Sequence, residues 1–445
     1  MTKVYIQTMG CSANLAESEL MMGLLQEAGF QIVDDLEYSD VNVVNICTVK
    51  GNYNALREIR KITEQYPKKK LVVAGCITKE LISPIRKLSQ DAALINTHNF
   101  HRIVYAVEES MHGNALEALT QERELKVGKP KIRTNRVIGI VPIASGCDDS
   151  CSYCSVKLIK GNIFSYPEEY IVKEIEKNLA HGCREIWLTS QDNGAYGIDK
   201  GERKLAKLLD KIMKIDGNFK VRLGMLNPRH VPEMIDHLIQ IYQDEKMFKF
   251  LHIPVEAGNN EVLGKMKRKY TVFQFKDIVE KFRRYVKNIT IATDMIVGFP
   301  GETEAQFHDT LELVQEVKPD IINIARFSPR PNTSASKMKD AISGDKKKDR
   351  SRVLTELFNS IALKNNQKWI GWKGKIIIDE HGKNSTFVGR NFAYKPVIVK
   401  GDFQLGDEVE VTVQDATNYD LRAEVNGNAE DHSNQDLIQI STSLT

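Results

Sequence analysis

Three cysteines, Cys147, Cys151 and Cys154, stand close together at the spacing C-x3-C-x2-C. No histidine lies between His112 and His181, so the local set of soft metal ligands ends at three. A structural zinc ion needs four ligands, usually Cys and His, whereas three thiolates on a four-iron cube leave one iron open. The spacing therefore favours an iron–sulfur site whose open iron binds a substrate or cofactor. Two alternatives remain open: three unrelated structural cysteines, or a zinc site completed by a distant residue.

Length and composition set the broad class of protein. A chain of 445 residues predicts two or three domains. Seven cysteines without an export signal in front of them favour the reducing cytoplasm. We expect no membrane span, because no apolar run reaches the roughly 18 residues that one requires. The net charge is only +3, so any nucleic-acid surface must be local.

Strands alternate with helices in residues 1–112, and three predicted strands each end near a cysteine. The strands are 4–8, 41–46 and 71–75, the cysteines are Cys11, Cys47 and Cys76, and the helices are 18–30 and 55–65. Strands that alternate with helices form a parallel sheet, and ligands collect at the carboxyl ends of its strands. The three cysteines are therefore predicted to converge on one point. The alternative is that each is a small buried hydrophobe.

A second α/β region is expected over residues 137–367. Its six strands are predicted at 137–143, 185–189, 220–226, 250–255, 289–297 and 321–325. Six strand–helix units suggest a partial parallel barrel with its site at the carboxyl ends of the strands. Polar residues and a glycine-rich turn follow these strands and are candidate cofactor contacts. These candidates are Gln191, Asp192, Gly298, Pro300 and Glu302.

Two of these features have plainer interpretations. The turn at Gly298 would equally suit an ordinary strand-to-helix connection, with Glu302 balancing the helix dipole. Cys183 stands before a strand and outside both cysteine groups, so we interpret it as a buried structural thiol.

Residues 368–428 change to short strands with Gly and Asp turns, which predicts a small antiparallel β-barrel. Basic and aromatic residues are interleaved there, as in surfaces that stack bases and hold phosphates. The candidate RNA contacts are Arg390, Phe392, Tyr394 and Lys395. Residues 113–136 are predicted to be a connector, either a solvated linker or an RNA contact. The polar tail 429–445 is predicted to be disordered.

The cysteine spacing, with Tyr153 before the last cysteine, resembles the radical S-adenosylmethionine (SAM) superfamily. The resemblance implies that the open iron chelates S-adenosylmethionine, that Tyr153 contacts this cofactor, and that an electron from the cluster releases a 5′-deoxyadenosyl radical. Residues 7–14, 44–49 and 74–76 are similar to the N-terminal domain of the methylthiotransferases. This resemblance covers nearly the whole chain. It implies a second [4Fe-4S] cluster on Cys11, Cys47 and Cys76, and a C-terminal RNA-binding TRAM barrel.

The residues after Cys154 resemble one branch of the methylthiotransferases. Lys157, Lys160, Gly161, Ser165 and Tyr166 follow in the order of the archaeal and eukaryotic branch that acts on N6-threonylcarbamoyladenosine in tRNA. The resemblance implies conversion of this nucleoside, at position 37 beside the anticodon, to its 2-methylthio derivative. An electron donor and a sulfur source are implied as further partners. Lys157 or Lys160 is expected to pair with the threonyl carboxylate.

The chain departs from the family pattern in two places. Lys160 stands where arginine is usual, which keeps the charge but loses a bidentate contact. Glu256 and Ala257 stand where Gln and Ser are usual, and an ionised carboxylate cannot donate a hydrogen bond. Two other functions remain open: a methylthiotransferase acting on an aspartate of a ribosomal protein, and an RNA-binding protein whose iron sites are only structural.

Overall fold

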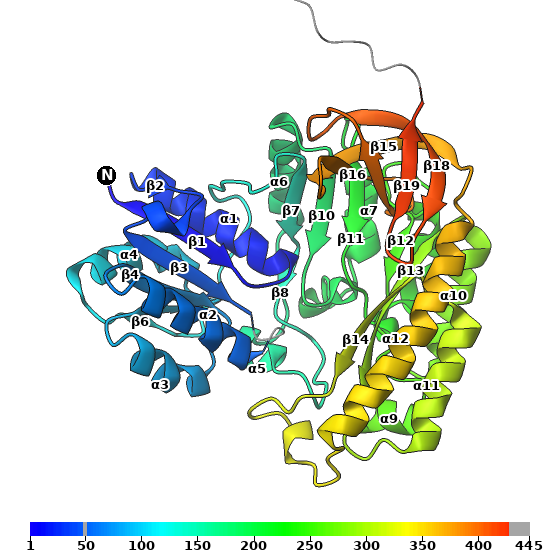
Figure 1. Cartoon of the computed structure of the whole chain (residues 1–445), viewed down its shortest axis with the longest axis horizontal. Helices are drawn as coiled ribbons and strands as arrows, with labels where there is room; N and C mark the ends of the chain where they lie inside the picture. The colour runs from blue at the N-terminus through cyan, green and yellow to red at the C-terminus, as the bar shows by residue number, and fades with distance from the viewer. Residues whose placement is uncertain (48–50, 427–445) are drawn as a thin grey trace, which may run out of the picture.

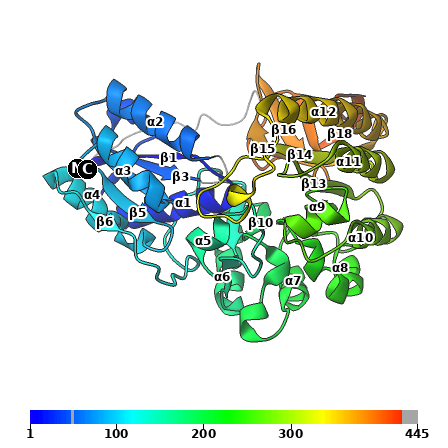
Figure 2. The same ribbon diagram turned by 90° about the horizontal axis from the view of Figure 1, so that it is seen from below.

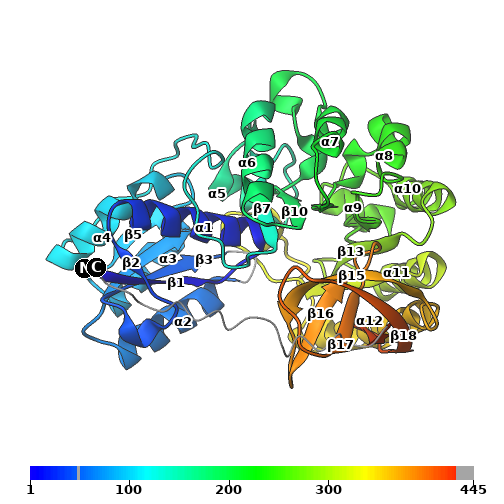
Figure 3. The same cartoon turned by 90° about the horizontal axis from the view of Figure 1, so that it is seen from above.

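The computed structural model describes residues 1–47 and 51–426. These residues form an N-terminal α/β unit, a central α/β core and a C-terminal β-barrel, and Figures 1, 2 and 3 show both outer parts resting against the core. The predicted fold class is confirmed. Thr48, Val49 and the tail 429–445, which was expected to be disordered, lie outside the described residues. No helix in the described ranges is long and apolar enough to cross a membrane.

The N-terminal unit is a six-stranded parallel sheet in the order β2-β1-β3-β4-β5-β6 (Figure 1). Its strands are β1 (Lys3–Thr8), β2 (Gln31–Ile32), β3 (Val41–Ile46), β4 (Lys70–Gly75), β5 (Ala93–Asn96) and β6 (Glu117–Ala118). Helices α1 (Ser12–Glu27) and α4 (Ile103–His112) pack on one face, and α2 (Asn52–Gln65) and α3 (Lys79–Leu88) on the other. Because β1, β3 and β4 are adjacent and parallel, their carboxyl ends lie side by side.

Helix α1 begins at Ser12, six residues before the predicted start at residue 18. Its first turns carry polar residues that are buried, including Asn14 and Ser18. Asn45 on β3 donates hydrogen bonds to the Asn14 carbonyl and to Ser18 Oγ, both at 2.9 Å. An apolar period cannot reveal a helix start whose buried face is polar, which explains the wrong boundary.

The connector 113–136 is not a solvated linker. It contributes β6 to the N-terminal sheet, and two of its lysines form buried ion pairs. Lys126 Nζ lies 2.7 Å from Glu17 Oε1 on α1, and Lys131 Nζ lies 2.7 Å from Glu174 Oε1 in the core. Buried carboxylates on both neighbours hold its basic residues, so the segment joins the N-terminal unit firmly to the core.

The core contains two three-stranded parallel sheets. They consist of β7 (Ile138–Pro142), β10 (Glu185–Thr189) and β11 (Lys220–Leu223), and of β12 (Phe250–His252), β13 (Thr290–Val297) and β14 (Ile321–Arg326). Phe248 N donates to Val221 O at 3.0 Å and Leu226 N donates to His252 O at 2.9 Å, which joins the two sheets between β11 and β12. The six strands therefore form one continuous arc, the predicted partial barrel.

Helices cover the outside of this arc. They are α6 (Glu168–Ala180), α7 (Leu205–Met213), α8 (Ile235–Ile241), α10 (Val272–Tyr285), α11 (Glu304–Val317) and α12 (Gly344–Gln367). Shorter elements are β8 (Ala144–Ser145), α5 (Val156–Lys160), β9 (Phe164–Ser165) and α9 (Asn260–Lys265). The charged run 345–352 is the first part of α12.

Five strands form the closed C-terminal barrel in the order β15-β16-β17-β19-β18. They are β15 (Lys373–His381), β16 (Thr386–Arg390), β17 (Pro396–Lys400), β18 (Glu408–Ala416) and β19 (Leu421–Val425). The turn between β16 and β17 inserts Tyr394 into the core, where its ring centroid lies 4.9 Å from that of Phe248 and 5.0 Å from that of Phe250. Because Phe250 begins β12, the barrel closes the amino end of the strand arc.

Candidate active site

The structure brings both cysteine trios to one cavity of about 250 Å³ between the N-terminal unit and the core. Cys11 lies directly before α1, and Cys47 and Cys76 directly follow β3 and β4. The second trio comes from the loop between β8 and α5. All six thiols line the cavity: Cys11, Cys47, Cys76, Cys147, Cys151 and Cys154.

Cys147 and Cys154 differ from Cys11 in their electrostatic surroundings. Burial raises the pKa of Cys147 to about 12 and that of Cys154 to about 11. These thiols suit a metal cluster, because the positive charge of iron is what would ionise them at neutral pH. The pKa of Cys11 is instead lowered to about 5, chiefly by a hydrogen bond with Cys47 and also by the charge of Lys160.

Polar groups on the core side of the cavity follow three neighbouring strands. Ser190, Gln191 and Asp192 follow β10, Asn227 follows β11, and Glu256 follows β12. Within the described chain, Ser190 Oγ and Gln191 Oε1 are buried and have no hydrogen-bond partner. Buried polar groups are normally hydrogen-bonded, so these two oxygens are available to a ligand. Together with Tyr153, which also lines the cavity, these groups fit the amine, carboxylate and hydroxyl groups of S-adenosylmethionine.

Arg268 is a cavity residue that sequence reasoning missed. Its Nη1 lies 3.2 Å from Cys151 Sγ and its Nε donates to Tyr270 Oη at 2.8 Å. The guanidinium partly offsets the burial that raises the pKa of Glu256. Arg268 follows α9 in a segment without a strand-end pattern, so no sequence signal pointed to it.

Glu256 itself lines the cavity. It was not among the predicted contacts, because it stands where the family usually has glutamine. Its backbone φ is +71°, in the left-handed region that side chains other than glycine rarely adopt. Residues held in this way gather at functional sites, where the surrounding structure supports them. Asn227 and Asp149 were missed as well: Asn227 Nδ2 donates to Asp149 Oδ2 at 3.1 Å on the same wall.

The predicted contacts Gly298, Pro300 and Glu302 do not line the cavity. Glu302 Oε2 accepts from Gly298 N at 2.7 Å and lies 2.6 Å from Arg350 Nη1 on α12. Arg350 and Glu302 are both buried. The turn is therefore used to attach α12 to the core, through a partner 48 residues further along the chain.

The predicted RNA contacts on the barrel lie in its interface with the core. Lys395 Nζ is 2.9 Å from Asp320 Oδ1, and Arg390 Nε is 2.9 Å from Asp379 Oδ2. Tyr394 is buried among core aromatic rings, and the Phe392 ring lies 5.6 Å from that of Trp369. Lys395 and Tyr394 contact the core directly and are buried there, whereas the ion pair of Arg390 and the ring contact of Phe392 lie within the barrel itself. Basic and aromatic residues suit a buried cation–aromatic interface as well as they suit RNA.

The two lysines expected at the substrate differ in exposure. Lys160 is 8% exposed and its Nζ lies 2.9 Å from Glu17 Oε1. Lys157 is partly exposed and its Nζ donates to the Asp148 carbonyl oxygen at 3.2 Å. Lys160 lines the cavity from the side of the first trio, whereas Lys157 lies beside the loop that carries the second.

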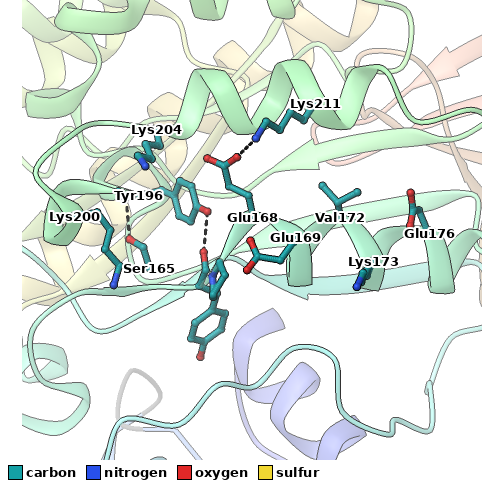
Figure 4. Close-up of a pocket in the computed structure, with 13 residues that line it drawn as sticks. Ser165, Glu168, Glu169, Val172, Lys173, Glu176, Tyr196, Lys200, Lys204 and Lys211 are labelled. Carbon is teal, nitrogen blue, oxygen red and sulfur yellow. Dashed lines mark hydrogen bonds and ion pairs between the residues drawn. The ribbon is translucent and has the colours of Figure 1, made fainter.

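A separate hollow of about 690 Å³ lies between α6 and α7 (Figure 4). Glu168 pairs with Lys211 across it, and Tyr196 Oη donates to the Tyr166 carbonyl oxygen at 2.8 Å. No cysteine lines this hollow, so we do not assign it to the reaction centre.

Three family models match successive parts of this chain. Residues 141–314 match the Radical SAM superfamily, residues 3–96 match uncharacterized protein family UPF0004, and residues 371–425 match the TRAM domain. The radical S-adenosylmethionine methyltransferase TsrM from Kitasatospora setae, solved with cobalamin and a [4Fe-4S] cluster, superposes with a TM-score of 0.54 at 12% identity. The match covers 76% of this chain and 74% of TsrM and shows a shared fold.

Two curated relatives match along most of their length. The probable threonylcarbamoyladenosine tRNA methylthiotransferase of Methanothermobacter thermautotrophicus is 39% identical over 424 residues, 95% of this chain and 99% of the relative. The threonylcarbamoyladenosine tRNA methylthiotransferase of Homo sapiens is 35% identical over 434 residues, 95% of this chain and 74% of the relative.

The fold and the superfamily match over residues 141–314 define a radical SAM protein. Its cofactors are S-adenosylmethionine and two [4Fe-4S] clusters. Within that class, the chain belongs to the family of threonylcarbamoyladenosine tRNA methylthiotransferases.

Proposed function

We propose that this protein converts N6-threonylcarbamoyladenosine, at position 37 beside the anticodon of tRNA, to its 2-methylthio derivative. The observation that carries the proposal is that two cysteine trios line one cavity in a chain of this family. Cys147, Cys151 and Cys154 would hold the cluster whose open iron takes S-adenosylmethionine, and Cys11, Cys47 and Cys76 would hold the auxiliary cluster. Two equivalents of S-adenosylmethionine would be used: one would supply the radical that takes hydrogen from carbon 2 of adenine, and the other the methyl group, carried on a sulfur atom from the separate sulfur source.

The protein's own residues bind, orient and shield the reactants. The unpaired oxygens of Ser190 and Gln191 would take up the polar groups of the cofactor. Val156 and Ile159 give the cavity an apolar wall near the second trio. An apolar wall keeps water from a reactive radical.

Lys157 is the better of the two lysines for the threonyl carboxylate. Lys160 is buried against Glu17, whereas Lys157 is partly exposed at the cluster loop. The Asp148 carbonyl takes one of the three N–H donors of the Lys157 ammonium. The threonyl carboxylate would accept a charge-assisted hydrogen bond from one of the other N–H groups of this ammonium.

A groove of about 1310 Å³ on the barrel is the better RNA surface. It is lined by exposed residues of β15, β17 and β19, among them His381, Lys400 and Arg422. His381 packs its ring 5.2 Å from Phe387. The carboxylates of Glu380, Asp420 and Glu424 also line this groove. Basic residues with an aromatic ring nearby support binding of phosphates and bases, and the segment matches the TRAM domain. An electron donor and a sulfur source complete the partners, in the cytoplasm where thiols stay reduced.

The test uses anaerobically reconstituted protein and two tRNAs of one sequence, with and without the threonylcarbamoyl group. Nucleoside mass spectrometry should find a methylthio group only on the threonylcarbamoylated tRNA. Lys157→Met should lower that turnover at least about tenfold, as loss of one charge-assisted contact predicts, while cofactor cleavage without tRNA persists. Lys157→Arg should retain most turnover. Equal turnover of isopentenylated tRNA, or methylthiolation of a ribosomal-protein aspartate instead, would refute the proposal.

A further inference from the structure

Three buried charges lie behind the first cysteine trio. Glu17 Oε1 accepts hydrogen bonds from Lys126 Nζ at 2.7 Å, from Lys160 Nζ at 2.9 Å and from Thr97 Oγ1 at 2.9 Å. The side chains of Glu17, Lys126 and Lys160 are 4%, 6% and 7% exposed. Two ammonium groups therefore share one carboxylate in a place that water barely reaches. A second buried carboxylate, Glu124, with its side chain 6% exposed, lies within electrostatic reach of Lys126. Buried charges are costly unless an opposite charge stands nearby.

The two lysines face different surroundings. Lys126 also donates to Thr97 Oγ1 at 3.0 Å, and its Nζ lies 4.7 Å from the Phe100 ring centroid, on the side away from the cavity. Lys160 lines the cavity itself. Burial lowers the pKa of Lys160, but the charge of Glu17, and after it charge on Cys76 and Cys11, raise it above its usual value, so these cysteines lie within electrostatic reach of the ammonium. Lys160 is thus the cation of this group that faces the first trio.

We propose that Lys160 is a positioning residue that serves as the buried counter-ion of the auxiliary cluster and raises its reduction potential. The inference rests on the proposed function only in requiring a cluster on Cys11, Cys47 and Cys76. Three thiolates outweigh the charge of an oxidised four-iron core, so the loaded site is an anion. Reduction adds a further negative charge, and a fixed cation in a place of low dielectric favours the reduced form.

The geometry also says which side chain to change. Removing Lys160 leaves Glu17 with its Lys126 partner at 2.7 Å, so no carboxylate is left unpaired and the fold is retained. Lys160→Met should therefore change the cavity charge without unfolding the protein. Lys160→Arg keeps the charge. Lys129→Met is a matched control, because Lys129 is 30% exposed, pairs with Glu124 and does not line the cavity.

The experiment is a reductive titration of the reconstituted full-length protein, followed by electron paramagnetic resonance without tRNA. The signal that changes when S-adenosylmethionine is added is assigned to the radical cluster. The signal that does not change is assigned to the auxiliary cluster. A second titration in the Cys147→Ala/Cys151→Ala/Cys154→Ala background isolates that signal. Lys160→Met should shift the auxiliary midpoint potential to more negative values, Lys160→Arg should restore it, and Lys129→Met should leave it unchanged.

The outcomes separate this inference from the function on which it rests. A Lys160→Met protein with full iron content and a wild-type auxiliary potential would overturn the counter-ion role and leave the proposed function standing. An equal shift in Lys129→Met would also overturn it, because the effect would then be one of overall charge. If the first trio held no iron in the wild-type protein, the proposed function and this inference would both fail.

Discussion

Lys395 of the barrel places its ammonium nitrogen 2.9 Å from Oδ1 of Asp320, the core residue directly before β14. The same ammonium donates to Asn366 Oδ1 at 2.9 Å. These contacts, with Tyr394 among the core aromatic rings, fix the barrel to the amino end of the strand arc, while the cysteine cavity opens among its carboxyl ends. Deleting the barrel would expose Trp187 and Phe250 to water, so single substitutions are a better test of how the barrel is attached to the core.

Lys395→Ala should lower the free energy of unfolding by about 3–5 kcal/mol, because it leaves the Asp320 carboxylate without its cation. Urea unfolding of the full chain measures the change. Lys400→Ala, at an exposed position on β17, is the control and should change stability by no more than about 0.5 kcal/mol. Similar losses in the two variants would show that the Lys395 pair does not fix the barrel.

Stability should depend on pH through Glu185, a buried residue where barrel and core meet. Burial, and then the charge of Asp379, raise the pKa of Glu185 to about 8. A carboxyl group whose pKa is higher in the folded protein than in the unfolded chain stabilises the fold at pH values below its unfolded pKa, which is about 4.3. That stability is lost as the pH rises towards about 8. Urea midpoints should fall over this range in wild type and fall less in Glu185→Gln, whereas exposed Glu280→Gln should follow wild type.

Iron content should report two clusters. Anaerobically reconstituted protein is expected to hold about eight irons, the sum of two four-iron clusters. Changing Cys147, Cys151 and Cys154 together to Ala should remove about half of the iron, and changing Cys11, Cys47 and Cys76 the other half. Iron analysis and absorption spectra provide the measurement. A triple variant that keeps all its iron, or native protein that binds only zinc, would contradict the assignment.

Cys183 should be dispensable for chemistry. It is 3% exposed within the apolar core and burial raises the pKa of its thiol to about 11, so it remains protonated. Cys183→Ala should keep iron content and turnover near wild type, with a modest loss of stability from the small cavity. If a soluble, folded Cys183→Ala protein lost one whole cluster, a ligand would have been misassigned.

Much of the fold followed from local patterns. Buried strands such as β3 and β10 read as short apolar runs, and the structure places them at the predicted residues 41–46 and 185–189. β5 and β6 escaped prediction, being four and two residues long. At the site, Gln191 and Asp192 were indicated because they directly follow a strand. Arg268 was not indicated, because it reaches the cavity from a loop.

The chemistry available to this protein follows from its sequence: two trios of cysteines, one at adjacent strand ends and one in a tight loop, and a parallel arc to position them. Spacing of a few residues fixes which ligands share a loop, and strand order fixes which ends meet. Tertiary packing settles which charges face the cavity and which stabilise the fold. The sequence pattern predicts Lys395 and Glu302 as binding residues, yet each is buried against a partner far away in the chain. Burial and long-range pairing depend on how the three units pack against one another, and a local sequence pattern does not predict that packing.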